Sequence, residues 1–148
     1  MNFKKIGKFL LYLLPWFLSA ILFRSDTSYF SSLNKPFFAP PSWLFGIVWP
    51  ILYLLIAYVI YHTYDKADSQ YKKTLLVNYI SNQLFSFFFF TIKSNLLAFI
   101  DTVIVLVSSY LFYKIIKRDY EKYSKYLLPY LIWNIYATIL IISILAMN

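Results

Sequence analysis

The sequence predicts an all-α protein, an integral membrane bundle of five transmembrane helices. Three observations carry this prediction. The 148 residues are 61% hydrophobic with a mean hydropathy of +0.62, only 14% are charged, and the apolar residues gather in five long segments. A soluble domain of this length is closer to half apolar and carries more charge and glycine. We expect residues 1–148 to form a single transmembrane domain.

The five apolar segments are each long enough to cross a bilayer as a helix, which takes about 17–25 residues. Helices are required because a loop or strand edge facing lipid would leave backbone polar groups unpaired. A secretory signal is the alternative for the first segment, but no small-residue cleavage site follows it. We expect helices at residues 6–23, 43–64, 73–90, 96–116 and 126–147.

The basic residues are distributed unevenly between the predicted loops. Eleven of the 14 Lys and Arg residues lie at the N-terminus and in the second and fourth loops, and three lie on the other side. Because loops rich in Lys and Arg stay in the cytoplasm, this asymmetry predicts a cytoplasmic N-terminus in a multi-pass protein of the cell membrane. The same placement explains the net charge of +8 without nucleic-acid binding.

Composition also limits the chemistry that the chain could perform. It has no cysteine and a single histidine, His62, which lies near the end of the second segment. A thiolate nucleophile is excluded, and we expect no metal site and no required cofactor. Aromatic residues near segment ends are typical of the membrane interface. They are Trp16, Tyr64, Tyr71, Tyr123 and Tyr126.

The first loop and the second segment form the most distinctive stretch. Three prolines, at positions 36, 40 and 41, keep the end of the loop out of a helix. Trp43, Gly46, Trp49 and Tyr53 then follow at steps of three, three and four, so they share one helical face. Gly46 leaves a gap between two indoles. A long loop in a compact protein is either a lid or a tether, and both remain open here.

Polar residues inside the third and fourth segments are the next candidates. Asn78, Asn82 and Ser86 recur every four residues and should point into the bundle, either to join helices or to line a cavity. Asp101 is the only acidic residue inside the fourth segment. A carboxylate within a membrane is a functional candidate, but a structural role is the stronger expectation: Asp101 either lies close enough to the outer face to reach water or accepts a hydrogen bond from another helix.

The fifth segment carries a second aromatic stripe. Trp133, Ala137 and Leu140 share a face, and Ala137 leaves room one turn beyond the indole. Such a stripe is often simple packing. Beside a second tryptophan-bearing helix it also predicts an aromatic cage.

Together these stretches resemble the TspO/MBR family, whose names include tryptophan-rich sensory protein, translocator protein and peripheral benzodiazepine receptor. The chain departs from the family pattern at Phe38, where a tryptophan is common, and at Leu140-Ile141, where Leu-Asn is common. The matching residues are Lys35-Pro36, Pro40-Pro41, Trp43, Gly46, Trp49, Leu52-Tyr53, Asn82, Phe85, Ser86, Asp101, Pro129-Tyr130, Trp133, Tyr136 and Ala137.

The resemblance implies a homodimer that binds tetrapyrroles such as protoporphyrin IX in a cavity under the first loop. It also implies binding of benzodiazepine-receptor ligands, and light-dependent porphyrin degradation in which Trp49 and Trp133 would be the catalytic residues. A porphyrin transporter or stress sensor without catalysis is the alternative, and a purely structural membrane protein is a third. The porphyrin, or another flat apolar molecule, would be a ligand and not a cofactor, with membrane lipid as the other partner. The expected ligand-binding residues are Tyr29, Pro40, Trp49, Tyr53, Asn82, Phe85, Ser86, Trp133 and Ala137.

Overall fold

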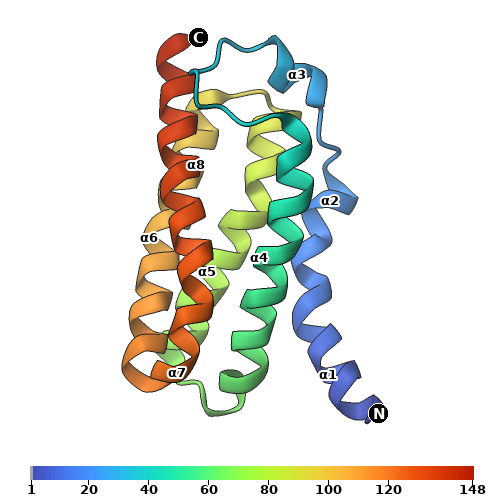
Figure 1. The fold of residues 1–148 in the computed structure, drawn as a ribbon, viewed down its shortest axis with the longest axis vertical. Coiled ribbons are helices and arrows are strands. Elements are labelled where there is room, and N and C mark those ends of the chain that lie inside the picture. Colours follow the sequence, from blue (N-terminus) through green and yellow to red (C-terminus); the bar gives the residue numbers. More distant parts are fainter. Residues whose placement is uncertain (1) are drawn as a thin grey trace.

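The computed structural model describes residues 2–148, and every secondary-structure element in that range is helical. The long helices stand side by side, with the N-terminus at one end of the bundle and the C-terminus at the other (Figure 1). This confirms the predicted all-α membrane bundle. The elements are α1 Phe3–Leu13, η1 Leu14–Phe17, α2 Leu18–Leu22, α3 Thr27–Ser32, α4 Ser42–Thr63, η2 Tyr64–Lys66, α5 Ser69–Ser86, η3 Phe87–Thr91, α6 Asn95–Asp119, α7 Glu121–Ser124, η4 Lys125–Leu127 and α8 Leu128–Met147.

Four helical stretches among these residues are long and apolar enough to cross a membrane. They are Phe3–Leu22, Ser42–Lys66, Asn95–Asp119 and Glu121–Met147. The remaining predicted span, at residues 73–90, corresponds to α5, a long helix of the bundle that is not apolar enough to be counted among these four. Its polar side chains are buried against the neighbouring helices instead of facing lipid. The buried ones are Asn78, Ser81, Asn82 and Gln83.

The first span is built from three consecutive pieces instead of the single helix predicted for residues 6–23. A 3-10 turn, η1, separates α1 from α2, with Pro15 at its start. Proline lacks a backbone donor and clashes with the preceding turn, which accounts for the change in helix geometry. The helix predicted for residues 73–90 is α-helical only up to Ser86, and the following stretch, Phe87–Thr91, is a π-helix.

The side chains form two packed cores along the bundle. The larger core surrounds Ile56, Tyr71 and Phe112, and the smaller one, near the first loop, surrounds Phe30 and Phe89. Trp16 and Tyr71 belong to the larger core, with exposed fractions of 2% and 1%. Their predicted placement at the membrane interface is therefore wrong. Both lie near segment ends in the sequence, but neighbouring helices cover them.

The first loop crosses the end of the bundle that holds the C-terminus (Figure 1). It contains the short helix α3, whose N-cap is Asp26. The Lys93 ammonium group lies 3.0 Å from the Asp26 carboxylate, which ties the start of α3 to the turn before α6. Further along, Asn148 donates to the Asn34 carbonyl at 2.9 Å and accepts from the Asn34 amide at 3.0 Å. The loop is thus fastened at two points.

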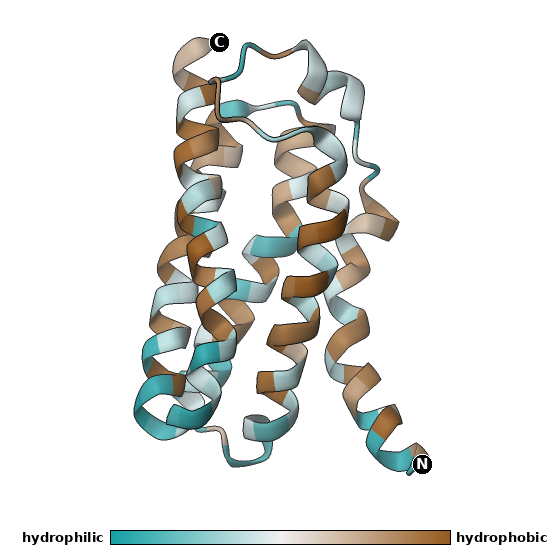
Figure 2. Ribbon diagram, viewed as in Figure 1, coloured by the Kyte–Doolittle hydropathy of each residue, from teal (hydrophilic) through white to brown (hydrophobic). Residues whose placement is uncertain are grey.

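The hydropathy of the residues changes along the bundle. Figure 2 shows hydrophobic residues over most of the long helices and hydrophilic residues gathered where α6 meets α7 and at the start of α1. The two termini lie at opposite ends, as the predicted topology requires. Which end faces the cytoplasm stays a prediction.

Candidate functional site

A cavity of about 450 Å³ lies among α2, α4, α5, α6 and α8, beneath the first loop. Helix α8 packs closely along α6, whereas α4 and α8 approach each other at few places. The space between α4 and α8 is lined by large aromatic side chains from both helices. The lining residues are Phe17, Ser19, Ala20, Ser25, Thr27, Phe30, Ser42, Trp43, Phe45, Gly46, Trp49, Pro50, Tyr53, Asn82, Phe85, Ser86, Phe89, Phe90, Thr102, Val105, Trp133, Asn134, Ala137, Leu140, Ile141 and Ile144.

Helix α4 supplies one wall of this cavity. Trp43, Gly46, Trp49 and Tyr53 all line it, so the helical face predicted from their spacing is confirmed. The rings of Trp49 and Tyr53 lie 5.7 Å apart with their planes at 31°. A Cβ atom built on Gly46 would meet no heavy atom within 4 Å, so the predicted gap between the indoles is open space.

Helix α8 supplies the opposite wall through Trp133, Asn134 and Ala137. The Trp133 ring lies 6.4 Å from the Trp49 ring, edge to face at 88°, and 6.0 Å from the Phe45 ring. Its Nε1 donor is buried and has no hydrogen-bond partner within residues 2–148. A buried donor without a partner is costly, so this N–H is an exception to the usual pairing of buried polar groups.

The predicted polar stripe of α5 divides into two parts with different roles. Asn82 and Ser86 line the cavity, whereas Asn78 does not. The Asn78 amide donates to Ser108 Oγ and Ser109 Oγ, both at 2.9 Å, which joins α5 to α6. Both possibilities left open for the stripe are therefore realised, at different turns of the same helix.

Asn82 connects the cavity to the hydrogen bonds below it. Its Oδ1 accepts from the Tyr53 hydroxyl and from Gln83 Nε2, each at 3.2 Å, and its Nδ2 donates to the Tyr130 hydroxyl at 3.3 Å. Tyr130 in turn donates to Asn78 Oδ1 at 2.9 Å. This network holds the amide of Asn82 in one orientation at the cavity wall, which is the property that a selective binding site needs.

Two predicted binding residues do not line the cavity. The Tyr29 hydroxyl donates to the Lys93 carbonyl at 3.1 Å and lies 3.0 Å from Asn95 Oδ1, so it holds the loop to the bundle. Pro40 is likewise absent from the wall. The first loop contributes Ser25, Thr27 and Phe30 instead, from the stretch in and just before α3. The remaining predicted residues line the cavity, and their part in binding stays a prediction.

Other candidates lie outside the cavity or were not predicted. Asp101 is buried, with 3% exposure, and is not a lining residue; its Oδ2 atom has no partner in the described part of the chain. His62 is exposed at the other end of the bundle, where its ring stacks on Tyr123 at 5.0 Å.

Asn134 lines the cavity but was not among the predicted binding residues, and its side-chain amide donates to Ser109 Oγ at 2.8 Å. As the only amide within the fifth apolar segment, it could have been found.

The charge of the cavity wall restricts its chemistry. Among residues 2–148, none of the lining side chains is an acid, a base or a histidine. The polar groups there are hydroxyls, amides and indole donors, which can orient a ligand but are not ordinary proton-transfer catalysts. The fold and the site together define a polytopic helical membrane protein with an aromatic cavity near one end.

Comparison with known proteins agrees with this class. Residues 9–147 match the model of the TspO/MBR family. The chain is 37% identical over 131 residues to the uncharacterized membrane protein YtaB of Bacillus subtilis, covering 86% of this chain and 84% of that protein. It is 35% identical over 137 residues to the tryptophan-rich protein TspO of Bacillus cereus, covering 90% and 89%. A third relative, the tryptophan-rich protein TspO of Archaeoglobus fulgidus, is 32% identical over 133 residues, covering 84% and 83%. The chain belongs to the TspO/MBR family.

Proposed function

We propose that this protein binds a tetrapyrrole such as protoporphyrin IX in the cavity between α4 and α8. The observation that carries the proposal is the pair of indoles, Trp49 from α4 and Trp133 from α8, which meet edge to face at the wall of an uncharged aromatic cavity. Its volume of about 450 Å³ falls within the range usual for small-molecule sites. A flat apolar macrocycle suits such walls because aromatic faces and edges both contribute attractive contacts.

Polar groups at the wall would fix the orientation of the macrocycle. The Trp133 Nε1 donor lacks a protein partner within the described residues. A rotation of the Trp133 indole that exposes this N–H would allow it to donate to a carboxylate or carbonyl oxygen on the ligand. Asn82 and Asn134 add amide groups that are held in place by Tyr130 and Ser109. Synthetic benzodiazepine-receptor ligands, which are also flat and largely apolar, would compete for the same space.

The proposal includes light-dependent oxidative degradation of the bound porphyrin. With no charged group on the wall, the groups most easily oxidised there are the indoles. Trp49 or Trp133 would donate an electron to the photoexcited macrocycle, the reduced macrocycle would combine with dissolved dioxygen, and the oxygenated macrocycle would return one electron to the indole, so that dioxygen is the only oxidant consumed. This route requires no resident cofactor and no metal.

The second candidate is a porphyrin transporter or stress sensor that performs no chemistry. The uncharged wall favours it, because such a wall binds and orients a ligand without offering an acid or base. The two tie points of the first loop also suit a gate through which a ligand passes. Both candidates share the binding step and differ only in what light does to the complex.

The experiment separates the two candidates in one sample. Purified protein in neutral detergent is titrated with protoporphyrin IX, following the porphyrin absorbance shift, and the complex is then illuminated with and without dioxygen. Binding followed by bleaching and a new product by mass spectrometry supports degradation. Binding with bleaching no faster than for free porphyrin supports the transporter or sensor. Absence of a saturable shift contradicts both.

The quaternary and cellular parts of the proposal are a homodimer in the cell membrane. Many large apolar side chains are exposed on the outside of the bundle, including Leu11, Ile21, Leu76 and Ile132. These surfaces suit lipid or a second copy of the chain. The mass of the detergent-solubilised protein, measured by light scattering after gel filtration, tests the dimer.

A further inference from the structure

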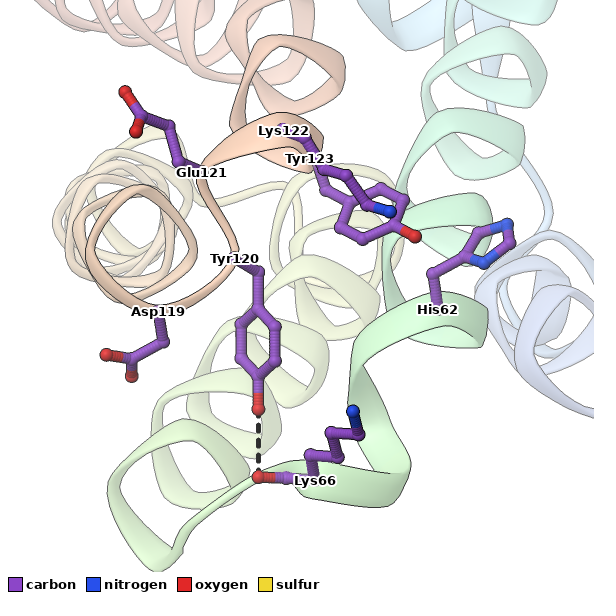
Figure 3. A pocket seen from close by; sticks show the side chains of 7 residues that line it. All are labelled: His62, Lys66, Asp119, Tyr120, Glu121, Lys122 and Tyr123. Atoms are coloured by element: carbon purple, nitrogen blue, oxygen red, sulfur yellow. Dashed lines mark hydrogen bonds between the residues drawn. The ribbon is translucent and has the colours of Figure 1, made fainter.

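A second hollow lies at the end of the bundle opposite the ligand cavity. It has a volume of about 710 Å³ and opens where the second span ends and the last two spans are joined (Figure 3). The lining residues are His62, Lys66, Asp119, Tyr120, Glu121, Lys122 and Tyr123. None of the residues expected to bind a porphyrin lines this hollow.

The walls of the hollow are held together by specific contacts. The Tyr120 hydroxyl donates to the Lys66 carbonyl at 2.8 Å, which joins the turn after α4 to the turn after α6. The His62 ring stacks on the Tyr123 ring at 5.0 Å with an angle of 11°. The Lys122 ammonium group lies over the same Tyr123 ring, 4.8 Å from its centroid. Two walls that are distant in the sequence therefore meet in a defined arrangement.

The acidic residues of the hollow are engaged elsewhere. Asp119 accepts two hydrogen bonds from the Arg118 guanidinium group, at 2.7 and 2.8 Å. Glu121 pairs with Lys117 at 2.7 Å. In Figure 3 both carboxylates point away from Lys66 and His62. The negative charges are therefore paired and directed outwards.

The basic residues of the hollow are free to bind an anion. Neither Lys66 nor Lys122 forms an ion pair within residues 2–148. The surrounding end of the bundle carries eleven Lys and Arg residues against four Asp and Glu residues. The hollow thus combines two unpaired ammonium groups with the Tyr123 hydroxyl and the His62 imidazole, a set of donors suited to phosphate oxygens.

The position of the hollow in the membrane indicates which kind of anion could reach its lysines. Helix α4 ends at Thr63, α6 ends at Asp119, and the last span begins at Glu121, so three span ends surround the hollow. Phospholipid headgroups lie at this level of a bilayer. Lys and Arg residues next to spans attract anionic lipids in this way.

We propose that the hollow around Lys66 and Lys122 is a binding site for the phosphate headgroup of an anionic phospholipid. The lipid's glycerol backbone would lie at the span ends, and its acyl chains would follow the outer surface of α4. This inference concerns the opposite end of the molecule and does not depend on porphyrin binding. It predicts that the protein retains anionic lipid when it is extracted from a membrane.

The test compares short-chain lipids by native mass spectrometry of the full chain in neutral detergent. The probes are dihexanoyl phosphatidylglycerol, dihexanoyl phosphatidylcholine and inorganic phosphate. The variant carries Lys66→Gln and Lys122→Gln, and its matched control carries Lys4→Gln and Lys5→Gln, at the start of α1. Helix α4 lies between α1 and α7 in Figure 1, so the control loses equal charge away from the hollow.

We expect the unmodified chain to bind phosphatidylglycerol more tightly than phosphatidylcholine. The double variant should lose affinity for phosphatidylglycerol by about thirtyfold, since each lysine near a membrane surface contributes about fivefold. The control should lose less than about threefold, because salt screens charges beyond about 8 Å. A variant with Lys66→Arg and Lys122→Arg should retain binding, because arginine also pairs with phosphate.

Three results would overturn the proposal. Equal losses in the variant and its control would mean that only the overall charge of this end matters. Equal binding of the two lipids would remove the role of the headgroup charge. Displacement of phosphatidylglycerol by equimolar inorganic phosphate would mean that the ligand is a free phosphate compound instead of a lipid. The exchanged lysines are all exposed, and unfolding temperatures equal to that of the parent would verify that the variants fold.

Discussion

The Trp49 and Trp133 rings meet edge to face at the wall of the aromatic cavity, with centroids 6.4 Å apart and planes at 88°. They come from α4 and α8, which otherwise approach each other at few places. Two indoles at right angles leave a corner in which one aromatic wall can lie against a ligand's face and the other against its edge. This corner is the basis of the first two predictions.

Replacing both indoles tests their part in porphyrin degradation. Trp49→Phe with Trp133→Phe should retain porphyrin binding, losing about 0.5–1.5 kcal/mol because phenyl rings preserve most of the aromatic contact. Any photodegradation should stop, since a phenyl ring is much harder to oxidise than an indole. Binding is followed by the porphyrin absorbance shift and degradation by loss of the Soret band under light. Equal bleaching in parent and variant would show that the indoles only form the walls.

Filling the gap at Gly46 should block the cavity without unfolding the protein. Gly46→Leu places its side chain in the open space between Trp43 and Trp49 on α4. Porphyrin affinity should fall by about tenfold or more, because overfilling a packed site costs about 1–3 kcal/mol. Gly46→Ala should raise the free energy of unfolding by about 0.5–1 kcal/mol, because alanine favours a helix over glycine. Gly7→Leu, also in open space but on α1, is the control and should bind porphyrin normally. Unchanged affinity in Gly46→Leu would place the ligand elsewhere.

Asn78 should matter for stability and not for ligand contact. Asn78→Leu removes the hydrogen bonds to Ser108 and Ser109 and leaves Tyr130 without its acceptor. We expect the free energy of unfolding to fall by about 2 kcal/mol, the range for buried polar groups that lose partners. Thermal unfolding in detergent measures this. Ser143→Ala, which removes a bond only to Ile139 of its own helix, should change little.

The loop attachment at Asp26 should resist mild acid. Hydrogen bonds from Ser28, the Lys93 ammonium group and the Tyr29 amide hold the pKa of the Asp26 carboxyl far below its ordinary value. A carboxyl with a lowered pKa stabilises the folded state above its unfolded pKa of about 3.9, and that contribution is lost as the pH falls towards the folded value. The attachment should therefore be intact from pH 7 to pH 5 and weaken only in stronger acid.

A spin label on the loop measures this attachment. The chain has no cysteine, so Ser31→Cys gives a single labelling site on exposed α3. Its spectrum should not change between pH 7 and pH 5, whereas adding Asp26→Asn should raise the mobility of the label at both values. Increased mobility at pH 5 in the parent would contradict the assignment to Asp26.

The asymmetry of the basic residues predicts a cytoplasmic N-terminus and an external C-terminus. Fusions of a cytoplasmically active reporter to each terminus should show activity only at the N-terminus. Because the chain has no cysteine of its own, an Asn148→Cys variant carries a unique thiol, which an impermeant reagent should label from outside. A cytoplasmic C-terminus would contradict the predicted topology.

Local patterns in the sequence predicted the bundle and most of the cavity-lining faces. Hydropathy marks a span through its own composition, and a helical repeat of 3.6 residues places Trp43, Gly46, Trp49 and Tyr53 on one face whatever packs against them. The sequence could not separate the roles of Asn78 and Asn82, since both lie on the inward face of α5. Only the position of α6 decides that Asn78 meets Ser108 and Ser109.

The sequence by itself determined that this protein is helical, lies in a membrane and places aromatic residues on the inner faces of its second and fifth segments. The tertiary structure decided that Trp49 and Trp133 meet at 88°, that Phe30 lines the cavity while Tyr29 fastens the loop, and that Trp16 is buried. The physical reason is the distance along the chain over which each property is determined. Burial and periodicity are properties of neighbouring residues along one helix, whereas a contact between helices depends on how separate segments pack against each other.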